Sequence, residues 1–155
     1  MRTNKRVVGI IVKDDRILVF RRFKDDHQYF AFPGGGVEEG ETEEAAVVRE
    51  MKEELCIDAK IEKLFFVISI EKEKNTLFKI EAGKDRTGYS KDQLFYLIKD
   101  FKGNPQLGGP EKERSSEINQ YYLEWLPFSK IGVTHNLYPE EGKDKLVEYI
   151  KESKI

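Results

Sequence analysis

The sequence of 155 residues is poor in cysteine and histidine and has no long apolar run. Its single cysteine, Cys56, can form no internal disulfide, which excludes the small disulfide-stabilised scaffolds of secreted proteins. The apolar stretch near the start is too short for a signal peptide or a membrane span, so we expect a cytoplasmic protein without a membrane partner. The net charge of -2 offers no general surface for a polyanion, and we expect no nucleic-acid partner.

The composition favours a single folded domain over residues 1–155. Hydrophobic residues make up 39% and charged residues 36%, the balance of a globular chain long enough to bury a full core. The sequence contains no repeat, no low-complexity segment and no Pro- or Ser-rich linker that would divide it.

Apolar and alternating stretches predict most of a sheet. Two strands, residues 7–12 and 17–22, are separated by Lys-Asp-Asp-Arg, which suits a tight hairpin turn. Further strands are predicted at residues 29–32, 64–70, 77–80 and 93–99, and where Tyr121, Leu123 and Trp125 alternate. A last helix is predicted over residues 140–151. Helices interspersed among strands indicate a mixed sheet between helical layers.

Charged residues recur at fixed intervals between residues 35 and 57. A helix turns by about 100° per residue, so Glu50, Glu53 and Glu54 fall on one stripe and the apolar residues on another. Thr42 suits an N-cap, and the helix is expected to begin near it. Upstream, residues 32–36 (Phe-Pro-Gly-Gly-Gly) are expected to form a loop whose glycines take strained dihedrals and offer carbonyls to a ligand.

A Glu-rich helix is most often a solvated face. Here, however, like charges stand three and four residues apart, at a cost of roughly a few tenths of a kcal/mol per pair, and only Lys52 intervenes. A divalent cation would reverse that repulsion, because Mg²⁺ and Mn²⁺ prefer carboxylate and carbonyl oxygens. The cluster therefore favours a metal site.

Gly35, Glu41 and residues 49–54 (Arg-Glu-Met-Lys-Glu-Glu) together resemble the Nudix box in residue type and spacing. Six of these positions match the box literally: Gly35, Glu41, Arg49, Glu50, Glu53 and Glu54. With ordinary residue usage, six such matches arise by chance at about 10⁻⁷ per window. One position departs from the pattern, because Cys56 stands where the box has a glycine. That glycine would end the helix as a left-handed cap, so the departure concerns local geometry more than the metal site.

The resemblance implies an α/β/α sandwich with a central mixed sheet. It also implies a hydrolase that uses Mg²⁺ or Mn²⁺ and cleaves a diphosphate linked to another group, with water attacking phosphorus. The small-molecule partner would be a nucleotide, and a homodimer stays open. The clustered carboxylates agree with this chemistry, because phosphoryl transfer mainly requires positioning and charge neutralisation.

The resemblance also implies roles for particular residues. Glu50, Glu53 and Glu54 would be metal ligands and catalytic residues, joined by the backbone carbonyl of Gly34. Arg49 would also be a catalytic residue, because its ion pairs would hold the glutamates in place. Glu41 would hold the loop and Arg49 in position.

The residue that accepts the proton of the attacking water is left open between the three box glutamates and a downstream carboxylate. Glu111, Glu113 and Glu117 precede the strand that ends at Trp125. We favour Glu117 because it is closest to that strand, although each of the three on its own is an ordinary solvated acid in most proteins.

Two residues are assigned to substrate binding. Arg21 and Arg22 end the second strand on opposite faces, and the strand register favours Arg22 as the phosphate-holding arginine common in the family. Phe32, beside the glycines, is the second. His27 and His135 lie in polar surroundings without metal-ligand spacing, and we assign neither a role.

The substrate class follows from what is missing after the box. The proline of the ADP-ribose pyrophosphatases and the tyrosine of the diadenosine polyphosphate hydrolases are both absent from their places. The MutT-type triphosphatases resemble this chain better, in length and in the Arg21-Arg22 strand end, and this resemblance implies hydrolysis of a nucleoside triphosphate to monophosphate and pyrophosphate. We expect no strong preference for oxidised guanine, because Glu140 or Glu141 stands where MutT has an asparagine. The alternatives are a Nudix-like domain that binds a nucleotide or a protein without turnover and, as the weakest, an acidic structural module.

Overall fold

The computed structural model describes residues 2–71, 90–109 and 119–155. The helices and strands, in chain order, are β1 (Arg2–Lys13), β2 (Arg16–Lys24), β3 (His27–Ala31), β4 (Gly34–Glu38), α1 (Glu43–Leu55), β5 (Asp58–Lys60), β6 (Lys63–Glu71), β7 (Ser90–Ile98), β8 (Asp100–Lys102), β9 (Asn119–Pro127), α4 (Phe128–Ile131), β10 (Leu137–Tyr138) and α5 (Glu140–Lys151).

Most of the strands form one curled sheet with β1 at its centre. β1 pairs in parallel with β7 and antiparallel with β4, and at its carboxyl end it pairs antiparallel with β2. β2 in turn lies between β3 and β9, both antiparallel to it. Parallel and antiparallel pairs within one eight-stranded sheet confirm the predicted mixed sheet.

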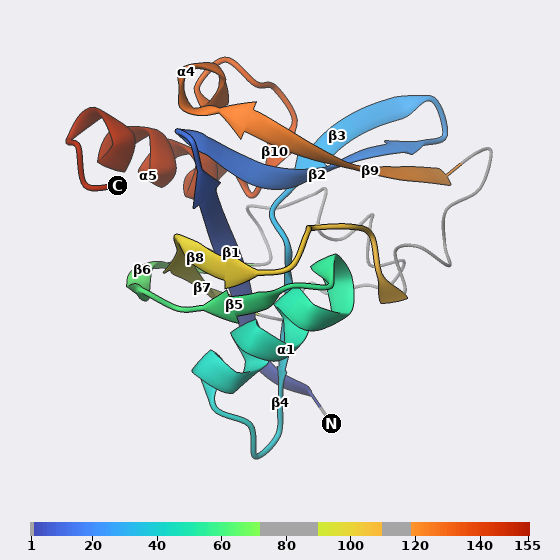
Figure 1. Ribbon diagram of the computed structural model, residues 1–155, viewed down its shortest axis with the longest axis vertical. Coiled ribbons are helices and arrows are strands. Elements are labelled where there is room, and N and C mark those ends of the chain that lie inside the picture. Colours follow the sequence, from blue (N-terminus) through green and yellow to red (C-terminus); the bar gives the residue numbers. More distant parts are fainter. Residues whose placement is uncertain (1, 72–89, 110–118) are drawn as a thin grey trace.

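Buried side chains form two clusters on opposite faces of this sheet, because successive residues of a strand point to opposite faces. On β7, Tyr96 and Ile98 join the cluster that includes α1, whereas Phe95 and Leu97 join the cluster that includes α4 and α5. Figure 1 shows α1 on one side of the sheet and α4 and α5 on the other. The predicted α/β/α sandwich is therefore confirmed.

The hairpin and the last helix also agree with the prediction. Asp14 and Asp15 have φ angles of 52° and 57°, the positive values that a two-residue type I′ turn needs at both central positions. Lys13 pairs with Arg16 beside this turn. The final helix covers the predicted residues 140–151.

The glycine stretch differs from the predicted loop. Residues 34–36 begin strand β4 and pair with residues 8, 7 and 6 of β1. No positive φ is found at Gly34, Gly35 or Gly36, so strained dihedrals do not explain these glycines. Close contacts with neighbouring atoms explain two of them, as the site shows below.

Some elements escaped the sequence pattern. The short strands β5, β8 and β10 and the single-turn helix α4 were not predicted. β3 covers residues 27–31 rather than 29–32, so Phe32 lies outside it. The strand predicted at residues 77–80 lies outside the described residues.

Candidate active site

Helix α1 begins and ends as its sequence predicts. Thr42 is the N-cap, and its side-chain oxygen accepts a hydrogen bond of 3.1 Å from the backbone N–H of Ala45. Cys56 ends the helix in the left-handed conformation, with φ 58° and ψ 33°, and its N–H donates to the carbonyl of Lys52. Cys56 thus has the left-handed conformation that is usual for a glycine at the end of a helix.

The segment after β8 caps the carboxyl end of the same helix. The backbone N–H groups of Gln106 and Gly108 donate to the carbonyls of Leu55 and Glu54, both at 3.0 Å. These are helix-end carbonyls that lack a partner within the helix. The last turn of α1, which carries Glu53 and Glu54, is therefore held by hydrogen bonds from the segment after β8 in addition to those within the helix.

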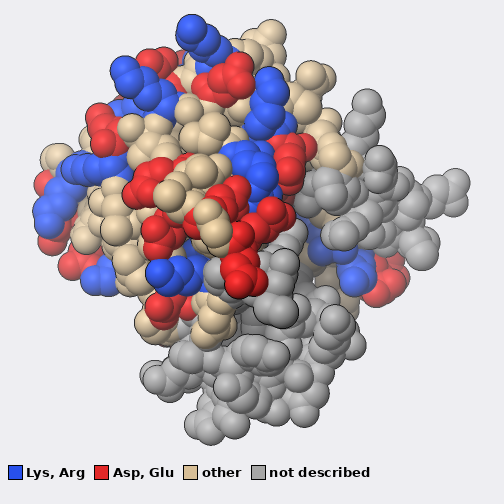
Figure 2. Space-filling view, turned by 90° about the horizontal axis from the view of Figure 1, so that it is seen from below, with Lys and Arg blue, Asp and Glu red and all other residues tan. Residues whose placement is uncertain are grey.

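The glutamates of α1 divide by their burial. Glu50 and Glu54 are only 5% and 7% exposed, whereas the Glu53 side chain is 51% exposed. Figure 2 views the molecule from the side of α1 and shows acidic side chains gathered there among a few basic ones. Two buried carboxylates on one helix need compensating partners, because an uncompensated buried charge is strongly destabilising.

Strand β4 supplies part of that compensation. The backbone N–H of Gly34 donates to Oε1 of Glu54 at 2.8 Å. The Glu50 carboxylate lies against Gly35, where an added Cβ would come within 2.2 Å of Oε1. An added Cβ at Gly34 would lie 2.1 Å from the carbonyl oxygen of Val7. Glycine is thus required at position 34 by the backbone of β1, and at position 35 it leaves room for the Glu50 carboxylate.

Arg49 joins the remaining acidic groups. Its guanidinium donates to both carboxylate oxygens of Glu41, at 2.7 and 2.9 Å, and to Oε1 of Glu50 at 2.9 Å. It also reaches Oε2 of Glu53 at 3.4 Å and the carbonyl of Gly36 at 3.0 Å. This geometry agrees with the expected pairing of Arg49 with the glutamates and with Glu41 as its brace.

The pairing changes the acidity of both groups. The Arg49 hydrogen bonds lower the pKa of Glu41 to about 2, with a smaller contribution from the backbone N–H of Glu38. The same bonds raise the pKa of Arg49, which stays protonated at any ordinary pH. Arg49 therefore acts as a permanent positive charge between the carboxylates.

The residues at the β4–α1 contact suit a hard divalent cation in their donor chemistry. Among the described residues, no three His, Cys, Asp or Glu side chains are grouped closely enough to hold a metal ion. The carboxylates of Glu50 and Glu54 nevertheless meet the glycine backbone of β4 at one place, and Glu53 precedes Glu54 on the same helix. Carboxylate and carbonyl oxygens are the ligands that Mg²⁺ and Mn²⁺ prefer.

Arg22 lies on the face of the sheet predicted for it. Leu18 and Phe20, two and four residues earlier on β2, pack in the cluster with α1, and the period of two places Arg22 on their side. Its guanidinium donates to the hydroxyl of Tyr29 at 2.5 Å and lies 4.6 Å from the ring centre of Tyr121. Substrate binding by Arg22 stays a prediction.

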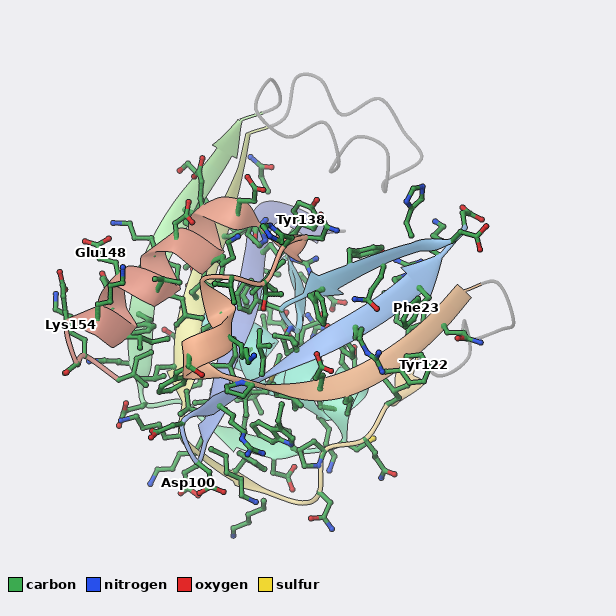
Figure 3. The ribbon with its side chains drawn as sticks, turned by 90° about the horizontal axis from the view of Figure 1, so that it is seen from above. Phe23, Asp100, Tyr122, Tyr138, Glu148 and Lys154 are labelled. Carbon is green, nitrogen blue, oxygen red and sulfur yellow. The ribbon has the colours of Figure 1, made fainter. Side chains whose placement is uncertain are left out.

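Arg21 occupies the opposite face, also as predicted. Its guanidinium carbon lies 5.3 Å from the ring centre of Phe23 and 4.9 Å from that of Tyr122. Figure 3 shows these two rings together where β2 and β9 approach their shared end. The nearest carboxylate, from Glu124, is 3.9 Å from Nε, a long ion pair.

Phe32 is placed differently from its prediction. Its ring is 3% exposed and packs edge-on against Phe95 in the core, with ring centres 5.6 Å apart. The ring is thus a core element, and direct contact with substrate is not what this packing supports. Substrate binding by Phe32 stays a prediction, because residue order near the glycines does not show which way the ring turns.

The other residues considered in the sequence are three downstream glutamates and two histidines. Glu111, Glu113 and Glu117 lie outside the described residues. His27 and His135 are exposed, in keeping with the absence of an assigned role.

Sequence reasoning missed Arg6, whose Nη2 lies 3.4 Å from the carbonyl of Gly34. It also missed Tyr29 and Tyr121 around Arg22. Each of these contacts joins residues of different strands, so only the strand pairing could have revealed them.

Comparisons with known proteins agree with this geometry. The family model of the NUDIX domain matches residues 3–149. The structure resembles the E. coli ORF135 protein, with a TM-score of 0.68 and 23% identity over 95% of this chain and 88% of that one. It also resembles a MutT NUDIX hydrolase from Burkholderia pseudomallei, with a TM-score of 0.68 and 24% identity over 93% and 95%. No helix in the described ranges is long and apolar enough to cross a membrane.

Curated relatives match over shorter stretches. An ADP-ribose pyrophosphatase of Methanocaldococcus jannaschii is 50% identical over 64 residues, which are 41% of this chain and 38% of that protein. An 8-oxo-dGTP diphosphatase of Escherichia coli is 43% identical over 67 residues, 41% of this chain and 52% of that protein. An RNA pyrophosphohydrolase of Pelagibacter ubique is 33% identical over 96 residues, 59% of each. The matches thus span 38% to 59% of the length of these relatives. The match to the NUDIX domain, in contrast, covers nearly the whole chain, so the chain belongs to the NUDIX hydrolase family.

Proposed function

We propose that this protein is a Mg²⁺- or Mn²⁺-dependent pyrophosphohydrolase that converts a nucleoside triphosphate to a nucleoside monophosphate and pyrophosphate. The observation that carries the proposal is the pair of buried carboxylates, Glu50 and Glu54, held against the glycines of β4. Buried acids kept in place by backbone groups are expensive for the fold, which is typical of a functional site.

The cation would be held by Glu50, Glu53 and Glu54 with the carbonyl of Gly34. When bound, it would neutralise phosphate charge and lower the pKa of an attacking water. Arg49 fixes Glu50 and Glu53 through its ion pairs, and Glu41 fixes Arg49. The network thereby sets the positions of the ligands before substrate arrives, which is the main demand of phosphoryl transfer.

In the proposed reaction, water forms a bond to phosphorus as the bridging P–O bond of the anhydride breaks. Pyrophosphate leaves with the electron pair of that bond. The proton of the water passes to a carboxylate, and the choice between the box glutamates and a downstream residue such as Glu117 stays open. Arg22, enclosed by Tyr29 and Tyr121, would hold the negative charge of the substrate.

A second candidate substrate is ADP-ribose. The M. jannaschii relative, named as an ADP-ribose pyrophosphatase, is 50% identical over the matched 64 residues. Against it stands the absence of the proline expected after the box, since residues 70–74 read Ile-Glu-Lys-Glu-Lys. A nucleoside triphosphate therefore remains our leading proposal.

The test is a panel assay with purified protein. The four nucleoside triphosphates, 8-oxo-dGTP, ADP-ribose and a 5′-triphosphorylated RNA are incubated with Mg²⁺, with Mn²⁺ and with EDTA. We expect cation-dependent release of pyrophosphate from at least one triphosphate. Faster cleavage of ADP-ribose than of every triphosphate would overturn the substrate proposal but leave the hydrolase standing, and no turnover of any compound would favour a binding module.

The variant Glu54→Gln tests the site itself. An amide keeps the shape of the side chain but removes the ligand charge, so we expect turnover to fall by about 10²- to 10³-fold, the range for loss of one catalytic electrostatic group. Glu62→Gln, at an exposed position, is the matched control and should keep wild-type turnover. Near wild-type turnover by Glu54→Gln would exclude the proposed site.

A further inference from the structure

Gln93 is a buried amide whose acceptor has no partner. The residue is 5% exposed, and among the described residues nothing donates a hydrogen bond to its Oε1. Burial of an unbonded polar atom destabilises a fold, so such groups are rare and call for an explanation. An apolar side chain of equal length would avoid the loss.

The strand register places Gln93 in one row that starts at the candidate active site. Gly36 of β4 pairs with Arg6 of β1, Arg6 pairs with Gln93 of β7, and Gln93 pairs with Ile68 of β6. The first two members both contact the site, since the Gly36 carbonyl accepts from Arg49 and the Arg6 guanidinium approaches the Gly34 carbonyl. Gln93 is the next residue outward along this row.

The face that carries Gln93 lies opposite α1. Phe95, two residues further along β7, belongs to the cluster with α5, and Gly142 of α5 packs directly against its ring. Gln93 therefore lies on the same face as Phe95, towards the start of β7. Ile68, its neighbour on β6, lines an open pocket of about 360 Å³ between β6 and α5, with Ser69, Glu141 and Asp144 among the other lining residues.

The spacing of strands gives the scale of this arrangement. Neighbouring strands are about 4.8 Å apart, so Gln93 lies roughly 10 Å across the sheet from β4. A substrate whose phosphate lies at β4 would therefore have to place its base on the face opposite α1 to meet Gln93. A glutamine side chain rotates about three bonds, so its amide can meet a ligand without movement of the strand.

We propose that Gln93 is a specificity residue whose amide oxygen accepts a hydrogen bond from an exocyclic amino group of the substrate nucleobase. This inference rests on the proposed nucleotide hydrolase. The unsatisfied acceptor of the free protein is then satisfied by the substrate. A base that lacks the amino group leaves it unbonded, which is how a buried polar group discriminates between analogues.

The test compares Gln93→Met with wild type on paired triphosphates. ATP is set against purine riboside triphosphate, and GTP against inosine triphosphate, because each pair differs by one amino group. We expect wild type to favour one amino-bearing member by about tenfold in KM, the factor for one hydrogen bond, and Gln93→Met to lose that preference at similar kcat. Gln93→Asn, which withdraws the amide by one methylene, should give an intermediate preference, and Gln28→Met, at an exposed position, should change nothing.

Stability is the second readout. Gln93→Met removes an unbonded acceptor, so its melting temperature should equal or exceed that of wild type without nucleotide. A lower melting temperature, or an unchanged preference between paired substrates, would overturn the proposal. A preference that shifts between ribose and 2′-deoxyribose substrates alone would also overturn it, because it would place a sugar hydroxyl on Gln93.

Calorimetric binding of α,β-methylene ATP separates failure of this inference from failure of the proposed function. Wild-type binding that weakens in Gln93→Met, without turnover of any compound, would reject the hydrolase and keep the role of Gln93. Equal binding of this analogue and of α,β-methylene GTP by both proteins would reject the role of Gln93, whether or not wild type hydrolyses nucleotides.

Discussion

Two arginines in this protein are held by different means. Arg49 is held by the carboxylates of Glu41, Glu50 and Glu53, so its positive charge is paired with negative charges of the protein itself. Arg22 contacts the ring and hydroxyl of Tyr29 and the ring of Tyr121, which orient a guanidinium without adding negative charge. The first arginine is thus paired with carboxylates of the protein, whereas the second lies between tyrosines, where we propose that it meets the negative charge of the substrate.

Arg49→Lys should produce the largest effect on this comparison. Lysine cannot donate in a fork to Glu41 and at the same time reach Glu50, so buried carboxylates lose partners. We expect a loss of about 1–3 kcal/mol in the free energy of unfolding, together with a large drop in kcat. Urea melts and a turnover assay measure the two effects. A wild-type melt and turnover would show that the network is dispensable.

Acid should weaken the network around Arg49. The pKa of Glu41 is lowered to about 2 from its ordinary 4.5, so the folded state binds a proton less readily than the unfolded state. The stability from this pair is therefore present above pH 4.5 and is lost as the pH falls from about 4.5 to 2. Glu41→Gln should flatten this part of the stability profile in denaturant melts at stepped pH. A profile identical to wild type would contradict the assignment.

The surroundings of Arg49 could be predicted from the sequence, whereas those of Arg22 could not. Residues 41–56 are close in sequence, so their helix and its N-cap could be predicted from the residues themselves, and the resemblance to the Nudix box supplied the left-handed end at Cys56 and the pairing of Arg49 with nearby glutamates. The surroundings of Arg22 could not, because Tyr121 reaches it only through the pairing of β2 with β9. The alternation of side chains along β2 predicted the face on which Arg22 lies, but it did not predict which residues surround it.

Packing direction accounts for the differences from expectation. Phe32 was assigned to substrate from its place beside the glycines, but a ring two residues from a site can turn into the core as easily as out of it. Gly34 and Gly35 were expected to need unusual dihedrals, whereas they need room for the atoms of Val7 and Glu50. Both distinctions depend on atoms that are far away in sequence.

Arg22→Lys should have a smaller effect, and one of a different kind. A lysine ammonium keeps the charge but loses the planar contact with the tyrosine rings. We expect KM for the triphosphate to rise by about three- to tenfold, the effect of one weakened charge-assisted hydrogen bond, with kcat and the melting temperature little changed. Arg21→Lys, on the opposite face, is the matched control. Equal effects from the two variants would remove the basis for preferring Arg22.

Cys56→Gly should have the smallest effect on stability and activity. It changes the end of α1 but neither of the two arginines, so it tests the helix separately from both. Cysteine at φ 58° carries a strain that glycine avoids, so we expect a gain of up to about 1 kcal/mol in the free energy of unfolding. Turnover should be unchanged. Clear destabilisation in denaturant melts would mean that the packing of the thiol outweighs the backbone strain.

The contact between Gly35 and Glu50 has a consequence for how this sequence can change over time. A methyl group at position 35 would lie within 2.2 Å of the Glu50 carboxylate, so that carboxylate would have to leave its present place. A shorter acid at position 50 would restore the space but would move the charge away from Arg49. We therefore expect positions 35 and 50 to change together in evolution rather than singly. A double replacement at these positions should restore folding more readily than activity.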